Sequence, residues 1–361
     1  MRLERERRSS RRREAQERHF GLWPGEPPTE GLRRMALGQL DLTIEVLEAG
    51  AQGAQDETAV HEARKALKRL RALVRLLEGP LGGKTAAREN AILRDAAAVL
   101  SGARDATVMV NTLDALLERH PRKLARRGSL ARLRRQLVSE RDGAAMRTAG
   151  DEASRTKALG ELRGLRVRVA LWSFPERDVI AVVEPGLKRV YRQGATRYRR
   201  AARAKADRVM AMHLWRKRVK DLRYAAEMLD RGEGESASQG ASSKAGKKAR
   251  KQAARRKQAA RRKRAGEIRR LAKRADSLGE MLGEDHDLAV LAELLRADGP
   301  RGALARARLG RGTRKTLLKL IARRRRSLRR RALSEGERLY RGSPKRFLRR
   351  VRAAHERAGK L

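Results

Sequence analysis

The chain has 361 residues, with 91 lysines and arginines against 43 aspartates and glutamates, and its formal net charge is +48. This length suffices for two domains with a sizeable buried core, and the positive excess favours polyanionic partners such as nucleic acid, an anionic membrane or a polymeric phosphate. The chain has no cysteine and no apolar run long enough to span a membrane, which excludes disulfides, thiolate chemistry and a membrane span. Aromatic residues make up only 3%, whereas proteins that bind single-stranded nucleic acid usually stack the bases on aromatic side chains.

Residues 1–30 are predicted to form a disordered charged arm, because they are rich in charge and then carry Pro24, Pro27 and Pro28. They lack the apolar core of a secretory signal, so we expect a cytoplasmic protein.

From residue 31 onward, apolar residues recur with helical periodicity and strand patterns are almost absent, which predicts an all-α fold. A connector with two prolines, 172–185, separates a first half, 31–182, from a second half, 183–358. The predicted helices cover 31–50, 57–78, 86–118, 129–147 and 151–171, and then 186–206, 208–231, 265–296, 303–331 and 334–358.

Residues 232–264 interrupt the second half with low-complexity sequence, rich first in Gly, Ser, Ala and Gln and then in Arg and Lys. The segment holds 12 basic and 2 acidic residues. We predict a disordered or fraying basic insertion that is a solvated charge run, with an auxiliary polyanion-binding arm as the alternative.

An eleven-residue pattern occurs twice, 152 residues apart: H-E-A-R-K-A-L-K-R-L-R from His61 and H-L-W-R-K-R-V-K-D-L-R from His213. A second pattern follows each copy, first as L-S-G-A-R-D-A-T-V with Asp105 and then as L-G-E-D-H-D-L-A-V with Asp287. The histidine and the aspartate are 44 residues apart in the first half and 74 in the second, and the difference is close to the length of the insertion. The simplest explanation is one helical unit used twice, with an approximate two-fold axis between the copies.

In each copy, helical geometry places the cations on one face and the apolar residues on the opposite face. Like charges one turn apart destabilise a helix by about a few tenths of a kcal/mol per pair, and neither face contains a glutamate to relieve this. Arginine forks fit phosphate oxygens, lysine supplies a mobile charge, and a turn repeats about every 5.4 Å along a linear polyanion. We therefore interpret both faces as anion-binding rather than as solvated surface. The first ladder is His61, Arg64, Lys65, Lys68 and Arg71, and the second ladder is His213, Arg216, Lys217, Lys220 and Arg223.

The ladder histidines are expected to be neutral near pH 7 beside so much positive charge, with a hydrogen-bonding role towards phosphate or towards the paired aspartates. No metal-binding pattern accompanies them, so no metal site is expected. Asp285-His286-Asp287 is interpreted as an N-terminal helix cap. The sequence G-P-L-G-G-K-T at 79–85 is one residue short of a P-loop and follows no strand, so it is predicted to be a turn between helices.

The two copies resemble the CHAD family, the conserved histidine α-helical domain, in the H-x-x-R-K-x-x-K-x-L-R helix of each half. The L-R-Y that closes the second copy and G-L-K-R-V-Y-R-Q-G-A-T-R-Y at 186–198 are also similar to the family. The resemblance covers 31–358 and implies two four-helix-bundle halves related by pseudo-two-fold symmetry, with a basic central surface. It further implies non-catalytic binding of inorganic polyphosphate and targeting to polyphosphate granules. Asp221 departs from the first copy, which has Arg69 at that position, and so removes one cation from the flank of the second ladder.

We therefore predict a polyphosphate-binding protein that is not an enzyme and needs no cofactor. A phosphotransferase would show paired carboxylates for Mg²⁺, whereas the only candidates are isolated aspartates, for which we expect a role in structural support. The alternative is a nucleic-acid-binding protein of low specificity, because counterion release favours binding to any densely charged chain. The sequence does not indicate the oligomeric state. The candidate site residues are the two ladders and Lys188, Arg192 and Arg199 for polyphosphate, with Asp105 and Asp287 for structural support.

Overall fold

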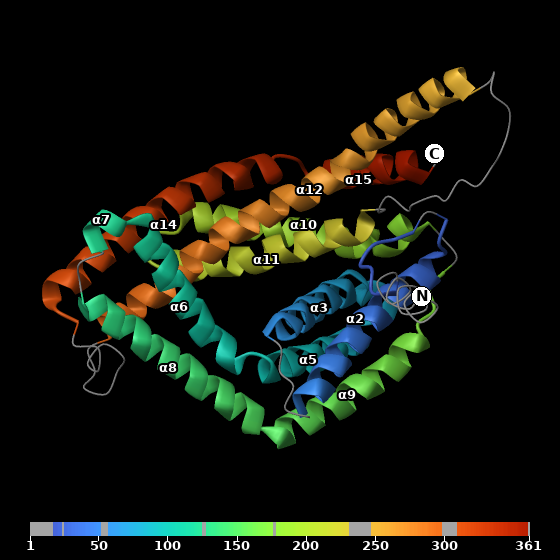
Figure 1. Ribbon diagram of the computed structural model, residues 1–361. Helices are drawn as coiled ribbons and strands as arrows, with labels where there is room; N and C mark the ends of the chain where they lie inside the picture. The colour runs from blue at the N-terminus through green and yellow to red at the C-terminus, as the bar shows by residue number, and fades with distance from the viewer. Residues whose placement is uncertain are drawn as a thin grey trace.

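All regular secondary structure is helical in the part of the chain that the structure describes (Figure 1), as the sequence predicts. The structure is a computed structural model that describes residues 17–23, 25–51, 57–124, 128–175, 178–230, 247–297 and 309–359.

A first four-helix bundle is formed by α2 (Pro28–Ala51), α3 (Glu57–Leu76), α5 (Gly83–Val99) and α9 (Glu152–Ala170). α3 packs between α2 and α5, and α9 closes the ring by packing against the same two helices. The short α4 (Glu78–Leu81) connects α3 to α5 through Gly82, whose φ of 81° is the left-handed region that glycine adopts readily. A connection between helices lies here as predicted, but it is shorter than 79–85, because α5 already begins at Gly83.

A second four-helix bundle is formed by α10 (Val179–Arg203), α11 (Arg208–Leu229), α12 (Lys247–Arg296) and α15 (Pro344–Gly359). α11 packs between α10 and α12, and α15 closes the ring against both of them. The motif helices α3 and α11 therefore hold the same place in their two bundles.

A third group of helices joins the two halves at one end of the molecule. It consists of α6 (Gly102–Arg119), α8 (Gly128–Gly150), α14 (Arg311–Leu339) and the C-terminal part of α12, with the short α7 (Pro121–Leu124) beside α6. Each long helix contributes a fully buried leucine to a separate hydrophobic cluster, namely Leu113, Leu133, Leu291 and Leu317.

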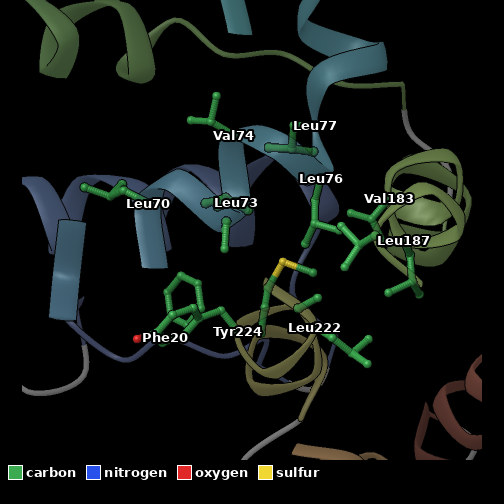
Figure 2. Packing of buried hydrophobic residues seen from close by; sticks show 14 of the residues in the cluster. Phe20, Leu70, Leu73, Val74, Leu76, Leu77, Val183, Leu187, Leu222 and Tyr224 are labelled. Carbon is green, nitrogen blue, oxygen red and sulfur yellow. The ribbon is translucent and has the colours of Figure 1, made fainter. Parts of the chain in front are cut away.

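One larger hydrophobic cluster runs through both bundles. Figure 2 shows Leu76 of α3 pointing towards Val183 and Leu187 of α10, with Leu222 of α11 nearby. Each such buried side chain contributes about 1.5–3 kcal/mol relative to an exposed one. The approach of α10 to α3 is close enough that a Cβ at Gly186 would overlap the backbone of Leu76, which explains glycine at this position.

Several predicted helix boundaries are wrong. The predicted helix 86–118 is broken at Ser101 between α5 and α6, and the predicted break after 331 lies inside α14, which continues to Leu339. The predicted connector 172–185 ends early, because α10 begins at Val179 and contains Pro185. A proline inside a helix costs about 3 kcal/mol, and the four buried apolar side chains of this first segment offset that cost: Val179, Ile180, Val182 and Val183.

Residues 17–23 are packed and hydrogen-bonded, so the predicted disordered arm is wrong for this segment. Phe20 and Leu22 are buried in the larger cluster, and the Leu22 amide donates to the carbonyl of Met228 at 3.2 Å. Arg34 donates to the carbonyls of His19 and Gly21. Apolar contacts and main-chain hydrogen bonds outweigh the charged, proline-rich composition here, and residues 1–16 lie outside the described part.

The predicted disorder of the insertion is also wrong for its second part, because the backbone of residues 247–264 is helical and forms the beginning of α12. Figure 1 shows this end of α12 projecting beyond the bundle. Ala, Lys, Arg and Gln are strong helix formers, and extending an existing helix avoids the unfavourable nucleation step. Residues 232–246 lie outside the described part.

Candidate anion-binding site

The first ladder lies on α3 opposite the side chains that pack into the bundle. Leu67, Leu70 and Leu73 are fully buried, whereas His61 is exposed and Lys65 is one-third exposed. The hydrophobic and cationic faces predicted from the sequence are therefore confirmed for this helix.

Arg64 differs from the rest of the first ladder because it is buried. Its Nη1 donates to the carbonyl of Leu100 and to Oγ of Ser101, both at 2.5 Å. The Ser101 hydroxyl in turn donates to the carbonyl of Ala97. Arg64 thus ties α3 to the junction of α5 and α6. Its role in the ladder is to hold this helix in position, and it is not a cation exposed to solvent.

Arg216 holds the equivalent place in the second half. Its guanidinium lies against Gly283, where a Cβ would approach Nη2 to 3.1 Å, and its Nη1 is 3.9 Å from Oδ1 of Asp287. Ser101 and Gly283 are equivalent in the aspartate patterns, so both arginines contact the same point of the second pattern. Asp105, by contrast, is exposed in the first turn of α6.

The second ladder faces acidic residues of α12. Arg223 pairs with Asp276 at 2.6 Å. A groove of about 560 Å³ between α6, α11 and α12 is lined by Arg216, Lys220 and Arg223, and also by four acidic residues, Asp276, Glu280, Glu284 and Asp287. When the two halves are aligned on Asp287 and Asp105, the positions of Asp276, Glu280 and Glu284 correspond to Arg94, Ala98 and Gly102 in the first half. The two ladders therefore differ in charge environment, and the acidic spacing along α12 was the sequence signal that could have indicated this.

The two ladder histidines also differ. The ring centroid of His213 is 4.3 Å from that of His286, and Nδ1 of each ring is buried with no hydrogen-bond partner among the described residues. Burial, together with His286 and three neighbouring cations, lowers the pKa of His213 to about 4. The expectation that this histidine is neutral near pH 7 agrees with that direction. The contact that the structure gives for its ring is with His286.

Two ion pairs join α3 to α11. Both use the same two positions of the repeat, with the two helices in opposite roles. Arg69 pairs with Glu227, and Arg75 Nη1 pairs with Oδ1 of Asp221 at 2.6 Å. In the repeat of 152 residues, Arg69 is equivalent to Asp221 and Arg75 to Glu227. A contact between positions i and j that recurs between j and i is what a two-fold axis produces. The pseudo-two-fold relation of the complete halves stays a prediction.

Asp221 is a buried carboxylate and not merely a missing cation. Arg218 lies 3.1 Å from its Oδ2, in addition to the bond from Arg75. Burial raises the pKa of the Asp221 carboxyl, and Arg75, Arg218 and Arg71 act in the opposite direction. Burial also lowers the pKa of Arg71, as does the nearby charge of Arg75. The end of the first ladder therefore meets α11 in a cluster where three guanidiniums surround Asp221.

Asp285-His286-Asp287 lies inside the C-terminal part of α12, far from the beginning of this helix, so its interpretation as an N-terminal cap is wrong. Asp285 is buried, and its Oδ1 accepts from Nε of Arg325 at 3.0 Å and from Nε of Arg329 at 2.9 Å. The motif thus joins α12 to α14, a role that required the position of α14 to be known.

The three candidate residues on α10 share one exposed face. Lys188, Arg192 and Arg199 are all exposed, and their spacing places them within about 40° of one another around the helix axis. α10 packs against α11, where Arg218 Nη1 donates to Oε1 of Gln193 at 3.0 Å. These cations extend the basic surface beyond the ladders.

None of the helices in the described parts of the chain combines the length and apolar character that crossing a membrane requires. Within the same residues, no group of three or more His, Cys, Asp or Glu side chains is placed to hold a metal ion.

A comparison with curated proteins finds none that matches the chain. A comparison with protein families matches residues 38–243 to the CHAD domain, a shorter range than the predicted 31–358 and one that ends inside the insertion. The matched range contains both ladders and more than half of the chain. The chain therefore belongs to the CHAD-domain family.

Proposed function

We propose that this protein binds inorganic polyphosphate through the two ladders and the exposed cations of α10, as a binding protein and not as an enzyme. The CHAD-domain family is a polyphosphate-binding family, which supports the proposal. Under the proposal, the phosphate chain lies along the cationic faces of α3 and α11, where a turn repeats about every 5.4 Å.

The observation that carries the proposal is the cluster at the junction of α3 and α11. Arg75 and Arg218 both pair with Asp221, and Arg71 lies close enough for its charge to act on this group. Concentrated positive charge of this kind is unfavourable in the free protein and attracts a polyanion. Arginine and lysine side chains donate charge-assisted hydrogen bonds to phosphate oxygens, and those bonds are stronger than neutral ones.

The first ladder is the stronger candidate of the two, because three of the four acidic residues in the groove beside the second ladder, Asp276, Glu280 and Glu284, have no acidic equivalents in the first half. Among the ladder lysines, Lys217 is exposed, and Lys65 is one-third exposed and pairs with Glu62 of its own helix at 3.3 Å, so both can meet a ligand. Arg64 contributes by holding α3 against the junction of α5 and α6.

One observation favours polyphosphate over single-stranded nucleic acid as the ligand. The large hydrophobic side chains that are exposed in the described residues are methionine, valine and leucine, and none is aromatic. Single-stranded nucleic acid is commonly held by stacking of its bases on exposed aromatic rings. A ligand without bases needs only the charge, and polyphosphate is such a ligand.

The experiment that tests this function is competition at fixed, near-physiological salt between long polyphosphate and RNA or duplex DNA at equal phosphate concentration. We expect polyphosphate to displace nucleic acid well before the reverse occurs. Equal displacement would contradict the polyphosphate assignment and favour unspecific binding by counterion release.

A double variant locates the site. Lys65→Glu with Lys217→Glu should weaken polyphosphate binding far more than deletion of 232–264. The matched control is Lys157→Glu with Lys345→Glu, which makes the same charge change at exposed positions on α9 and α15. If the control or the deletion weakened binding as much, net charge or the insertion would be responsible instead of the ladders.

The proposal extends to the location of the protein at polyphosphate granules in the cytoplasm. A fluorescent fusion should colocalise with stained granules, and the Lys65 and Lys217 double variant should not.

A further inference from the structure

A second basic groove, which no ladder residue lines, lies between the first turns of α11 and the middle of α14. It has a volume of about 590 Å³. No acidic side chain lines it, in contrast to the groove beside the second ladder. Its cationic lining consists of Arg208, Arg323, Arg326, Arg329 and Arg330.

The sequence of α14 places these arginines on one face. Arg323, Arg326 and Arg330 follow a spacing of three and four residues, so their side chains project to the same side of the helix. All three are exposed. The remaining lining includes the hydroxyl of Ser327 and the apolar side chains of Met212 and Leu333.

Arg329, which lines this groove, is held in place through one of its guanidinium nitrogens. Its Nε bonds to Asp285, while its Nη2 is buried with no hydrogen-bond partner among the described residues. Arg325, which bonds to the same carboxylate, also has a buried Nη2 without such a partner. Burial lowers the pKa of the Arg329 guanidinium, and the charges of Arg325 and Arg208 act in the same direction. A buried donor without a hydrogen-bond partner is unfavourable, and the guanidinium of Arg329, which lines the groove, adds its positive charge there.

A neighbouring groove continues the basic surface around the turn between α10 and α11. Its volume is about 730 Å³, and its cationic lining consists of Arg199, Arg200, Arg203 and Lys205. Asp207 is its acidic residue. Arg199, selected from the sequence as a polyphosphate ligand, therefore lies on this side of α11 rather than beside the aspartates of the second ladder.

We infer that the groove between α11 and α14 is a second phosphate-binding site, which takes a different segment of the same linear polyphosphate as the ladders. The inference rests on the proposed function for the identity of the ligand. Arginine forks bind two phosphate oxygens at once, and a serine hydroxyl supplies a further donor. A long chain that reaches both sites binds more tightly than either site alone, because the second contact forms within the complex.

The test is a groove variant with Arg323→Gln, Arg326→Gln and Arg330→Gln, measured by calorimetric titration. Tripolyphosphate reports on single sites, and long-chain polyphosphate reports on both sites together. The groove variant should bind one equivalent of tripolyphosphate fewer than the unmodified protein. Its affinity for the long chain should fall by about 100-fold or more.

The matched control removes three exposed arginines elsewhere, with Arg135→Gln, Arg147→Gln and Arg349→Gln. A second groove variant with lysine at the same three groove positions keeps the charge but loses the forked donors. Its affinity for long-chain polyphosphate should lie between that of the glutamine groove variant and that of the control. Circular dichroism checks that each variant is folded, which is expected because all six arginines are exposed.

The outcomes separate this inference from the proposed function. If the groove variant keeps its tripolyphosphate stoichiometry and matches the control in long-chain affinity, the groove site is refuted while the ladders stand. If the Lys65 and Lys217 variant is unaffected while the groove variant loses binding, the ladder proposal fails and the groove remains. If the groove variant loses duplex DNA but not polyphosphate, the ligand assigned to the groove is wrong.

Discussion

Asp285 is the residue whose removal should reveal most directly how α14 is held against α12. The Asp285 side chain is 3% exposed, and its partners Arg325 and Arg329 are 12% and 18% exposed. Both arginines donate from Nε to the same oxygen, Oδ1. Asp285→Ala removes the carboxylate and leaves two guanidiniums close together, with no negative charge between them.

The expected loss of stability follows from this burial. Removing one partner of a buried ion pair typically costs about 3–5 kcal/mol, because the remaining charge is left desolvated and uncompensated. Asp285→Asn keeps an oxygen for the two Nε donors and removes only the charge, so its cost should be smaller than that of Asp285→Ala. The difference between the two variants separates the hydrogen bonds from the charge.

Glu284 provides the control, since it is the preceding residue of α12 and also binds arginines. It pairs with Arg324 at 2.6 Å and Arg119 at 2.8 Å, but its side chain is 34% exposed. Exposed ion pairs contribute about 0–1 kcal/mol, so Glu284→Ala should cost much less than Asp285→Ala.

The assay is urea unfolding followed by tryptophan fluorescence. Trp215 is fully buried and lies against Gly336 of α14, so its emission reports on the packing of this helix. The reasoning is refuted if Asp285→Ala costs less than about 1 kcal/mol, or no more than Glu284→Ala.

Three further predictions concern packing, protonation and charge. Gly336→Ala places a Cβ 2.5 Å from the Trp215 ring and should lower the free energy of unfolding by about 1–3 kcal/mol. Gly279→Ala, with its nearest contact at 3.9 Å, should raise it by up to about 1 kcal/mol. Equal effects of the two substitutions in urea unfolding would contradict the packing. The pKa of His213 falls from 6.5 to about 4 on folding, so between these values the unfolded chain binds more protons and stability should fall as pH decreases through this window. An NMR midpoint of His213 near 6.5 would show this wrong. Asp276→Asn releases Arg223 and should raise polyphosphate affinity by a few-fold in direct titration; weaker binding would mean that the ion pair positions the second ladder.

The sequence was sufficient for features that belong to a single helix. The positions of His61, Lys65 and Lys68 on α3 follow from helical periodicity alone, because a turn of about 100° per residue fixes which side chains share a face. The apolar residues on the opposite face are buried as predicted. The repeat likewise paired α3 with α11 before any packing was known.

The sequence misled where contacts between helices outweighed a local preference. Pro185 indicated a connector, yet α10 continues through it, because the apolar residues before it are buried between the bundles. Phe20 and Leu22 lie in a segment of charged and proline-rich composition, and their burial outweighs that composition. Local propensity is a weak preference that tertiary packing readily overrides.

The sequence by itself determined the helical fold, the two cationic ladders and the family. Only the tertiary structure decided which of these cations face open solvent and which are held by neighbours. Arg64 and Arg216 have the same place in the pattern, yet one donates to a helix end and the other lies beside Asp287. The physical reason is that a charge is neutralised by groups that approach it in space. For Arg64, Arg216 and Arg223 those groups come from the junction of α5 and α6 and from α12, far from the ladders in sequence.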